Sequence, residues 1–247
     1  SDARMVMLDM SASVVEAGEL SVTAKAAVSL LTDVESLALV VESGDAEVTE
    51  TDDLNLGTVE MRSGSLSLEV GGNLDVFSDA GLKVADELSL KTTAGDLVLS
   101  SQVGGYGSNA LDKVTIVVGG DLSLDSVVEA SDLIDLKASG SLNSSRFTLK
   151  ASGTEGSIAL ETGESLLFAT GSVMEAADSL LLVSTSGDVV LSGDLLGLGG
   201  KVVKNIEAEA AGTLSVISTA KAKDRVTLKA TDFLVLGNLS QVVATGE

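Results

Sequence analysis

The stretch that decides the fold is residues 95–124, GDLVLSSQVGGYGSNALDKVTIVVGGDLSL, because it opens and closes on the same phrase. Each time a glycine and an aspartate precede an apolar couplet with one residue between its members. Such couplets recur along the whole chain at intervals of 17 to 25 residues. They begin at Leu20, Leu37, Leu54, Leu74, Leu97, Leu122, Leu142, Leu166, Val189, Leu214 and Leu239. Self-similarity at this period is typical of a solenoid, in which each repeat is one coil packed on its neighbours.

Two further couplets lie between successive anchors, and their period of two favours strands over helices. Examples are Leu82-x-Val84 with Leu88-x-Leu90, Phe147-x-Leu149 with Ile158-x-Leu160, and Val226-x-Leu228 with Phe233-x-Val235. We therefore predict an all-β fold, a right-handed single-stranded parallel β-helix of eleven to twelve coils with three short strands each. Residues 1–247 would form one domain, a rod about 50 Å long at the usual strand spacing of ~4.8 Å. The predicted core includes Leu54, Leu74, Leu97, Leu122, Leu166, Val189 and Leu214.

The composition agrees with stacked strands and argues against common catalytic chemistry. The chain has no proline, cysteine, histidine or tryptophan, and aromatic residues make up only 2%. Proline would remove a ladder hydrogen bond wherever it fell in such a stack. Without histidine and cysteine, the usual nucleophile–base pairs and most zinc sites cannot be assembled. We therefore expect a protein that is not an enzyme and has no cofactor.

Two regions depart from the repeat. Residues 103–110 concentrate glycine around Tyr106, the only tyrosine, and predict a protruding loop. Neither end resembles a cap, although an uncovered rung presents a row of unpaired backbone groups. Either flanking sequence is missing, so that the chain is a mature or excised piece, or the last rung of one molecule docks on the first rung of the next. The candidate assembly residues are Met5 and Met7 at one end and Leu239 and Val242 at the other.

The net charge of −22 predicts a surface that repels nucleic acid and anionic membranes and attracts divalent cations or basic partners. Asp121, Asp125, Asp132 and Asp135 form the densest acidic segment. Stacked on one face, these carboxylates could hold Ca²⁺ or serve as an acid–base pair; otherwise they are solvated outward positions. No run of the sequence is long and apolar enough to predict a membrane span.

The most basic segment holds Lys221, Lys223, Arg225 and Lys229. It could meet the acidic N-terminal half of a neighbouring molecule, since residues 1–124 carry −15 of the net charge, or it could be a solvated loop and strand face. Asn143 and Asn238 match glycosylation acceptors, at a frequency that chance explains.

Phrases such as Gly64-Ser65-Leu66-Ser67-Leu68 and Gly95-Asp96-Leu97-Val98-Leu99 resemble the repeats of filamentous-haemagglutinin-like exoproteins. This resemblance implies a secreted parallel β-helix, extracellular or on the cell surface, with an adhesin role. The chain is also similar to the polymerising bactofilins in being built of stacked β-coils, although only residues 20–54 have the spacing of their shorter coils. We expect a structural, fibre-forming protein that stacks head to tail. The alternatives are the shaft of a large secreted adhesin and a polysaccharide-active β-helix enzyme that uses the acidic segment.

Overall fold

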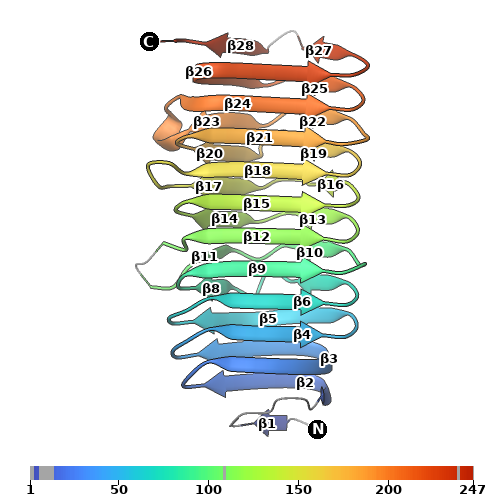
Figure 1. The fold of residues 1–247 in the computed structure, drawn as a ribbon, viewed down its shortest axis with the longest axis vertical. Helices are drawn as coiled ribbons and strands as arrows, with labels where there is room; N and C mark the ends of the chain where they lie inside the picture. Colours follow the sequence, from blue (N-terminus) through green and yellow to red (C-terminus); the bar gives the residue numbers. More distant parts are fainter. Residues whose placement is uncertain (1–2, 6–13, 108–109, 238–239, 247) are drawn as a thin grey trace.

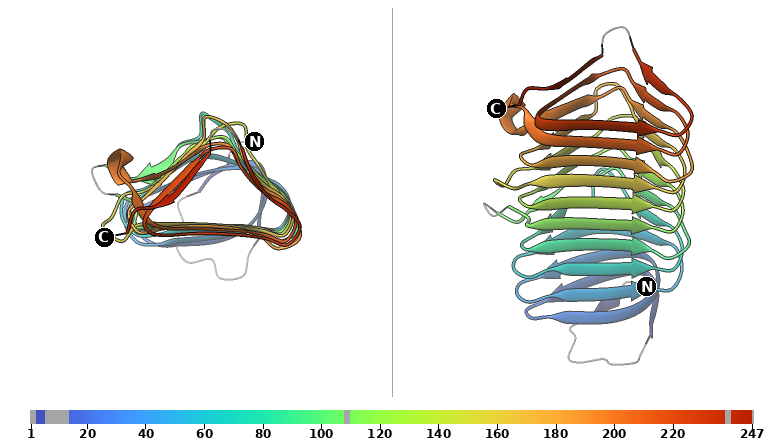
Figure 2. Two further views of the ribbon diagram at one scale, coloured as in Figure 1. Left: turned by 90° about the horizontal axis from the view of Figure 1, so that it is seen from above. Right: turned by 45° about the horizontal axis from the view of Figure 1, so that its top comes forward.

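The computed structural model describes residues 3–5, 14–107, 110–237 and 240–246. It confirms the predicted fold class: the chain winds into a parallel β-solenoid of about eleven turns (Figure 1). Every pairing between its strands is parallel and joins one coil to the next. Viewed along its axis, the solenoid has a triangular outline (Figure 2). The described residues hold a single helical turn, η1 (Leu198–Gly200).

The three sides of the triangle are three strand columns. The couplet face carries β1 (Ala3–Met5), β7 (Leu74–Val76), β10 (Leu97–Leu99), β13 (Leu122–Leu124), β16 (Leu142–Asn143), β19 (Leu166–Phe168), β22 (Val189–Leu191), β25 (Leu214–Val216) and β27 (Leu234–Leu236). The second face carries β8 (Leu82–Val84), β11 (Val103–Gly105), β14 (Val127–Ala130), β17 (Thr148–Ala151), β20 (Val173–Ala176), β23 (Asp194–Gly197) and β28 (Gln241–Ala244).

The long face carries β4 (Ala46–Glu50), β6 (Leu66–Val70), β9 (Glu87–Thr92), β12 (Lys113–Val118), β15 (Leu133–Ala138), β18 (Ser157–Thr162), β21 (Ser179–Ser184) and β24 (Val203–Ala210). Four longer strands run around a corner and contribute to more than one face. They are β2 (Val14–Ala24), β3 (Val28–Val41), β5 (Leu54–Met61) and β26 (Thr219–Ala230).

The core is a set of aligned apolar columns. Along the couplet face, Leu74 pairs with Leu97, Leu97 with Leu122, and the same register continues through Leu142, Leu166 and Val189 to Leu214. All seven predicted core residues are buried. The side chains alternate inward and outward along each strand, so one side of every strand faces the core and the other faces solvent. Phe147 and Phe168 meet edge to face inside the stack, with ring centroids 5.0 Å apart.

One couplet pairs differently from the prediction. Leu37 lies beside Leu56 rather than Leu54, and Leu39 lies beside Val59. One residue lies between Leu37 and Leu39 in β3, whereas two residues lie between Leu56 and Val59 in β5, and this extra residue is the signature of a bulge. The shift by two residues keeps Leu54 and Leu56 both facing inward, because the side-chain period of a strand is two.

The last coil corrects two predictions. Leu234, rather than Leu239, pairs with Leu214, and Leu236 pairs with Val216. The predicted inward pair Phe233 and Val235 therefore points outward, since a slip of one residue reverses every side chain. Leu239 and Met7 lie outside the described residues, whereas Met5 ends β1, which pairs with β2. Val242 belongs to β28 and pairs with Ala220.

The predicted loop 103–110 is shorter than expected. Its first three residues form β11, which pairs with β8 and β14, and Val103 is buried. Tyr106 and Gly107 follow the end of β11, Ala110 is exposed, and residues 108–109 lie outside the described part. Leu111 is again buried in the core, so the coil resumes there.

Candidate functional site

A ladder of side-chain hydrogen bonds follows the corner that precedes the couplet face. The side-chain oxygen of the residue directly before a couplet accepts a bond from the backbone N–H of the corresponding residue one coil further on. The acceptor–donor pairs are Asp53–Asn73 (2.6 Å), Asn73–Asp96 (2.8 Å), Asp96–Asp121 (2.8 Å), Asp121–Ser141 (2.7 Å), Ser165–Asp188 (3.4 Å) and Asp188–Thr213 (2.7 Å). This corner ladder satisfies N–H groups where the strands of the sheet are interrupted.

The glycines that open the repeated phrase make room for this ladder. A Cβ added at Gly120 would collide with Oδ1 of Asp96 in the coil before it, and one at Gly140 would collide with Oδ1 of Asp121. Gly72 and Gly212 stand in the same relation to Asp53 and Asp188. None of these glycines has a positive φ, so they are required for space and not for an unusual backbone conformation. The Gly-Asp-Leu phrases in the sequence contain this pairing of glycine with a hydrogen-bonding aspartate, but from the sequence alone they indicated only turns.

The four acidic candidates are not brought together. Asp121 belongs to the corner ladder, Asp125 follows β13 at the next corner, and Asp132 lies at the corner before the long face. Asp135 lies on β15 itself, where one of its oxygens is 3.8 Å from Nζ of Lys137. Among the described residues, no three acidic side chains are grouped so that they could hold a metal ion. Of the two alternatives for this segment, the stacked arrangement does not occur, because the segment passes two corners between Asp121 and Asp135.

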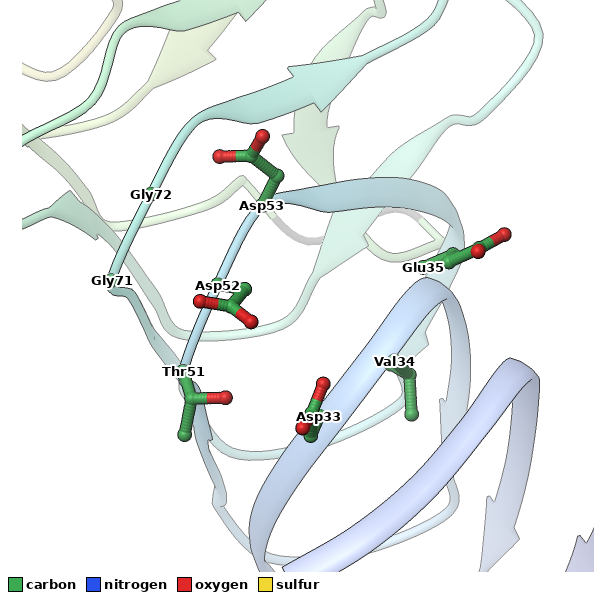
Figure 3. Close-up of a pocket in the computed structure, with 8 residues that line it drawn as sticks. All are labelled: Asp33, Val34, Glu35, Thr51, Asp52, Asp53, Gly71 and Gly72. Carbon is green, nitrogen blue, oxygen red and sulfur yellow. The ribbon is translucent and has the colours of Figure 1, made fainter.

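An acidic hollow of about 470 Å³ lies at the corner between the long face and the couplet face, near the N-terminal end (Figure 3). Asp33 and Glu35 line it from one coil, and Asp52 and Asp53 line it from the next. Figure 3 shows the Glu35 carboxylate pointing away from those of Asp33 and Asp52. The hollow forms where β3 crosses the corner as a continuous strand while the next coil turns between β4 and β5.

Glu50, at the end of β4 beside this hollow, is the one buried charged side chain among the described residues, with 1% exposure. Its Oε2 accepts a hydrogen bond from the N–H of Val34 (3.1 Å), and its Oε1 accepts bonds from Thr51 (2.8 Å) and Asp52 (3.4 Å). A buried carboxylate needs such partners, since an unpaired one would be strongly destabilising. Glu50 therefore ties together the corners of two coils, a role that sequence reasoning missed.

Ion pairs connect neighbouring coils on the outer surface. On the long face, Lys91 lies 2.7 Å from Glu69, and Lys229 lies 2.9 Å from Glu207 and 3.2 Å from Glu209. The hydrogen bonds to Glu207 and Glu209 raise the pKa of Lys229 above its usual value. These pairs are exposed, so they add little stability individually.

The C-terminal rung differs from every coil beneath it. We define it as residues 225–230 of β26 together with β27 and β28. Leu234 and Leu236 are 49% and 52% exposed, whereas their partners Leu214 and Val216 in the preceding coil are fully buried. Val226 and Leu228 of β26 are half-buried. Within the described residues, no strand pairs with the outer edge of this rung, so its apolar side chains and backbone groups form an open end (Figure 1).

Comparisons with protein-family models, with curated proteins and with solved structures found no match. The assignment of the fold therefore depends on the pairing and burial described above. In the part of the chain that the structure describes, no helix has the length and apolar character needed to cross a bilayer.

Proposed function

We propose that this protein is a structural, fibre-forming β-solenoid that stacks head to tail with other copies of itself and acts outside the cell or on its surface. The observation that carries the proposal is the open C-terminal rung, where side chains that are buried in every neighbouring coil are half-exposed. A second copy that covered this rung would bury Leu234 and Leu236 and pair the free strand edges. A contact of this head-to-tail kind does not close, so it generates a filament.

The surroundings of the acidic residues support a non-catalytic role. Asp121 accepts a backbone hydrogen bond, and Asp125, Asp132 and Asp135 lie at separate places around the coil. A polysaccharide-active enzyme would need two carboxyl groups that flank one sugar bond and lie roughly 5 to 9.5 Å from each other. Divalent cations are proposed partners only as diffuse counterions of the acidic surface.

The second candidate is the shaft of a large secreted adhesin, as the resemblance to filamentous-haemagglutinin-like exoproteins implies. The same open rung favours it, because the next coil of a longer chain would cover the rung equally well. Finding these residues inside a far longer reading frame would favour the shaft, and filaments formed by the isolated chain would favour self-stacking.

The decisive experiment is electron microscopy of the purified chain, combined with sedimentation to measure the critical concentration. Leu236→Asp should abolish filaments, because it places a charge at the proposed contact. Val235→Asp is the matched control: it lies on the same strand with similar exposure (47%) but points outward. Circular dichroism should show both variants folded. Wild-type protein that stays monomeric at every concentration, or equal behaviour of the two variants, would refute the proposal.

A further inference from the structure

The long face differs in charge from the rest of the molecule. Its consecutive strand segments from β6 to β26 are residues 66–70, 87–92, 113–118, 133–138, 157–162, 179–184, 205–210 and 225–230. They hold six acidic and five basic residues, a net charge of −1, whereas the whole chain carries −22. Viewed along the axis, these strands superimpose on one straight side of the triangle (Figure 2). Their outward side chains, which we call the long-face patch, therefore form a flat and nearly neutral surface.

Apolar and polar side chains are segregated on the long-face patch. Its outward apolar residues all lie on the four central strands, β12, β15, β18 and β21, and none of them is buried. They are Val117, Leu133, Ala159, Leu181 and Val183. On the two strand segments at either end of the patch, every outward residue is polar or charged. An apolar centre surrounded by a polar rim is the usual anatomy of a protein–protein interface.

One column of outward side chains on the patch carries a regular order of charges. The register aligns Glu69, Lys91, Val117, Lys137, Glu161, Val183, Glu209 and Lys229 along the rod. The charged members form three ion pairs between adjacent coils, and a valine separates each pair from the next. When the column is reversed end to end, every charge meets a charge of opposite sign and every valine meets a valine. The column is therefore complementary to a reversed copy of itself.

This complementarity fits a two-fold contact, in which two copies present the same patch to each other. When the two-fold axis runs parallel to the strands and passes between Lys137 and Glu161, the two rods are antiparallel and each column faces its own reversed copy. The facing residues are then Glu69 and Lys229, Lys91 and Glu209, Val117 and Val183, and Lys137 and Glu161. The four strands that carry the outward apolar residues lie around this same axis, so the apolar centres of the two patches meet.

Other arrangements of the two patches set like charges against each other. A shift by one coil brings Lys137 against Lys137 in one direction and Glu161 against Glu161 in the other. Parallel rods, related by an axis along the rod, would place Asp135 opposite Asp135. In the antiparallel register, Asp135 instead faces Ala159, its neighbour in the same column. Because like charges in direct contact are costly, they select the antiparallel register.

The patch is large enough for a stable dimer. Eight strands at a spacing of ~4.8 Å, with six residues each at ~3.3 Å, cover about 750 Å² on each copy, or about 1,500 Å² in total. Stable and specific interfaces bury about 1,200 to 2,000 Å². The acidic residues on the other two faces repel weakly across this contact, because charges more than about 8 Å apart are largely screened at physiological ionic strength.

We infer that the long-face patch binds the same patch of a second copy, so that two rods lie side by side and antiparallel. This lateral pairing goes beyond the proposed head-to-tail stacking and does not depend on it, because it uses the side of the rod and not the open rung. Where both contacts form, the filament has no overall polarity, since each rod lies beside one that runs in the opposite direction.

The test uses the full chain with Leu236→Asp as the parent, so that filaments do not obscure dimers, and measures dimerisation by analytical ultracentrifugation. One charge swap adds Glu69→Lys with Lys91→Glu, and the other adds Glu209→Lys with Lys229→Glu. Each swap keeps the net charge and an ion pair within the copy, but it sets like charges against each other across the contact. Each swapped variant alone should therefore dimerise at least tenfold more weakly than the parent. An equimolar mixture of the two should dimerise like the parent, because the swapped pairs then face each other.

The matched control is the swap Lys137→Glu with Glu161→Lys. These two residues face each other across the two-fold axis, so this swap preserves the complementarity and should dimerise like the parent. Circular dichroism should show every variant folded.

Cysteines test the register of the two copies. A short bis-maleimide should join a Val117→Cys copy to a Val183→Cys copy in a mixture. It should not join two Val117→Cys copies, whose cysteines would lie three coils, or about 14 Å, apart along the axis.

Three results would overturn the lateral pairing: a parent that stays monomeric at every concentration, swapped variants that dimerise alone like the parent, or a mixture of them that stays monomeric. Efficient cross-linking of Val117→Cys copies to each other would overturn the antiparallel register. None of these results decides head-to-tail stacking, which is tested separately by filaments of the wild-type protein.

Discussion

Gly120 and Asp96 should be energetically coupled, because a side chain at one position removes the hydrogen bond made by the other. A methyl group at Gly120 would overlap Oδ1 of Asp96 and would lie 3.2 Å from backbone atoms of Gly95. The Asp96 carboxylate would have to swing away and would lose its 2.8 Å bond to the N–H of Asp121.

The magnitudes follow from this geometry. Asp96→Ala should lower the free energy of unfolding by about 1 kcal/mol, the typical net value of one hydrogen bond. Gly120→Ala should cost about 2 kcal/mol, since it loses the same bond and also crowds the Gly95 backbone. The double variant should then lower the free energy of unfolding by about 2 kcal/mol, rather than by the sum of about 3 kcal/mol, and the difference is a coupling energy of about 1 kcal/mol.

Urea unfolding of the four proteins, followed by circular dichroism, measures this coupling. Gly104→Ala is the control, because a Cβ there would meet nothing within 4 Å, and its effect should be within about 0.5 kcal/mol. Strictly additive costs for Asp96 and Gly120, or a Gly120→Ala variant as stable as wild type, would refute the explanation of the Gly-Asp-Leu phrase.

Three further predictions address the core, the buried carboxylate and the surface pairs. Leu97→Asp should cost more than about 4 kcal/mol, because it buries an unpaired charge, whereas Asp96→Ser should cost little, since serine already occupies this position at Ser165; thermal melts compare the two. Glu50→Ala should cost about 2 kcal/mol by leaving the N–H of the buried Val34 without its acceptor, and the exposed Asp52→Ala should cost less than about 0.5 kcal/mol in the same urea titration. The folded-state pKa of Lys229 is raised, so the ion pairs of Lys229 should contribute fully to stability at neutral pH, and this contribution should disappear as the pH rises through that pKa. The free energy of unfolding of a Lys229→Met variant should therefore be lower than that of wild type at pH 7, and the two values should converge in strongly alkaline buffer.

The sequence predicted the fold well because the information is periodic. Inward residues of a parallel β-helix must recur once per coil, so Leu74, Leu97 and Leu122 could be aligned by spacing alone. The errors lie where the spacing is irregular. A bulge displaced the partner of Leu37, and at the C-terminal end the pattern fitted Leu239 as well as Leu234, which is the residue that pairs with Leu214.

Candidate sites were harder to predict, since they depend on where corners fall. Asp121 and Asp135 lie close in sequence, but two corners separate them in space. Conversely, Glu50 and Val34 are 16 residues apart and meet only because two coils stack. The alternation along β4 places Glu50 on the same inward side as Ala46 and Val48, and the buried neighbours Thr32 and Val70 in its column show this once the register is known.

The stacking register itself can be tested by disulfide formation, because the chain has no native cysteine. Val98 and Ser123 are outward neighbours on adjacent coils of the couplet face, so cysteines at both positions should oxidise readily to a disulfide. Cysteines at Val98 and Asp125, two residues out of register, should stay reduced under the same conditions. Equal oxidation of both pairs, or faster oxidation of the second pair, would contradict the aligned columns from which the rod is built.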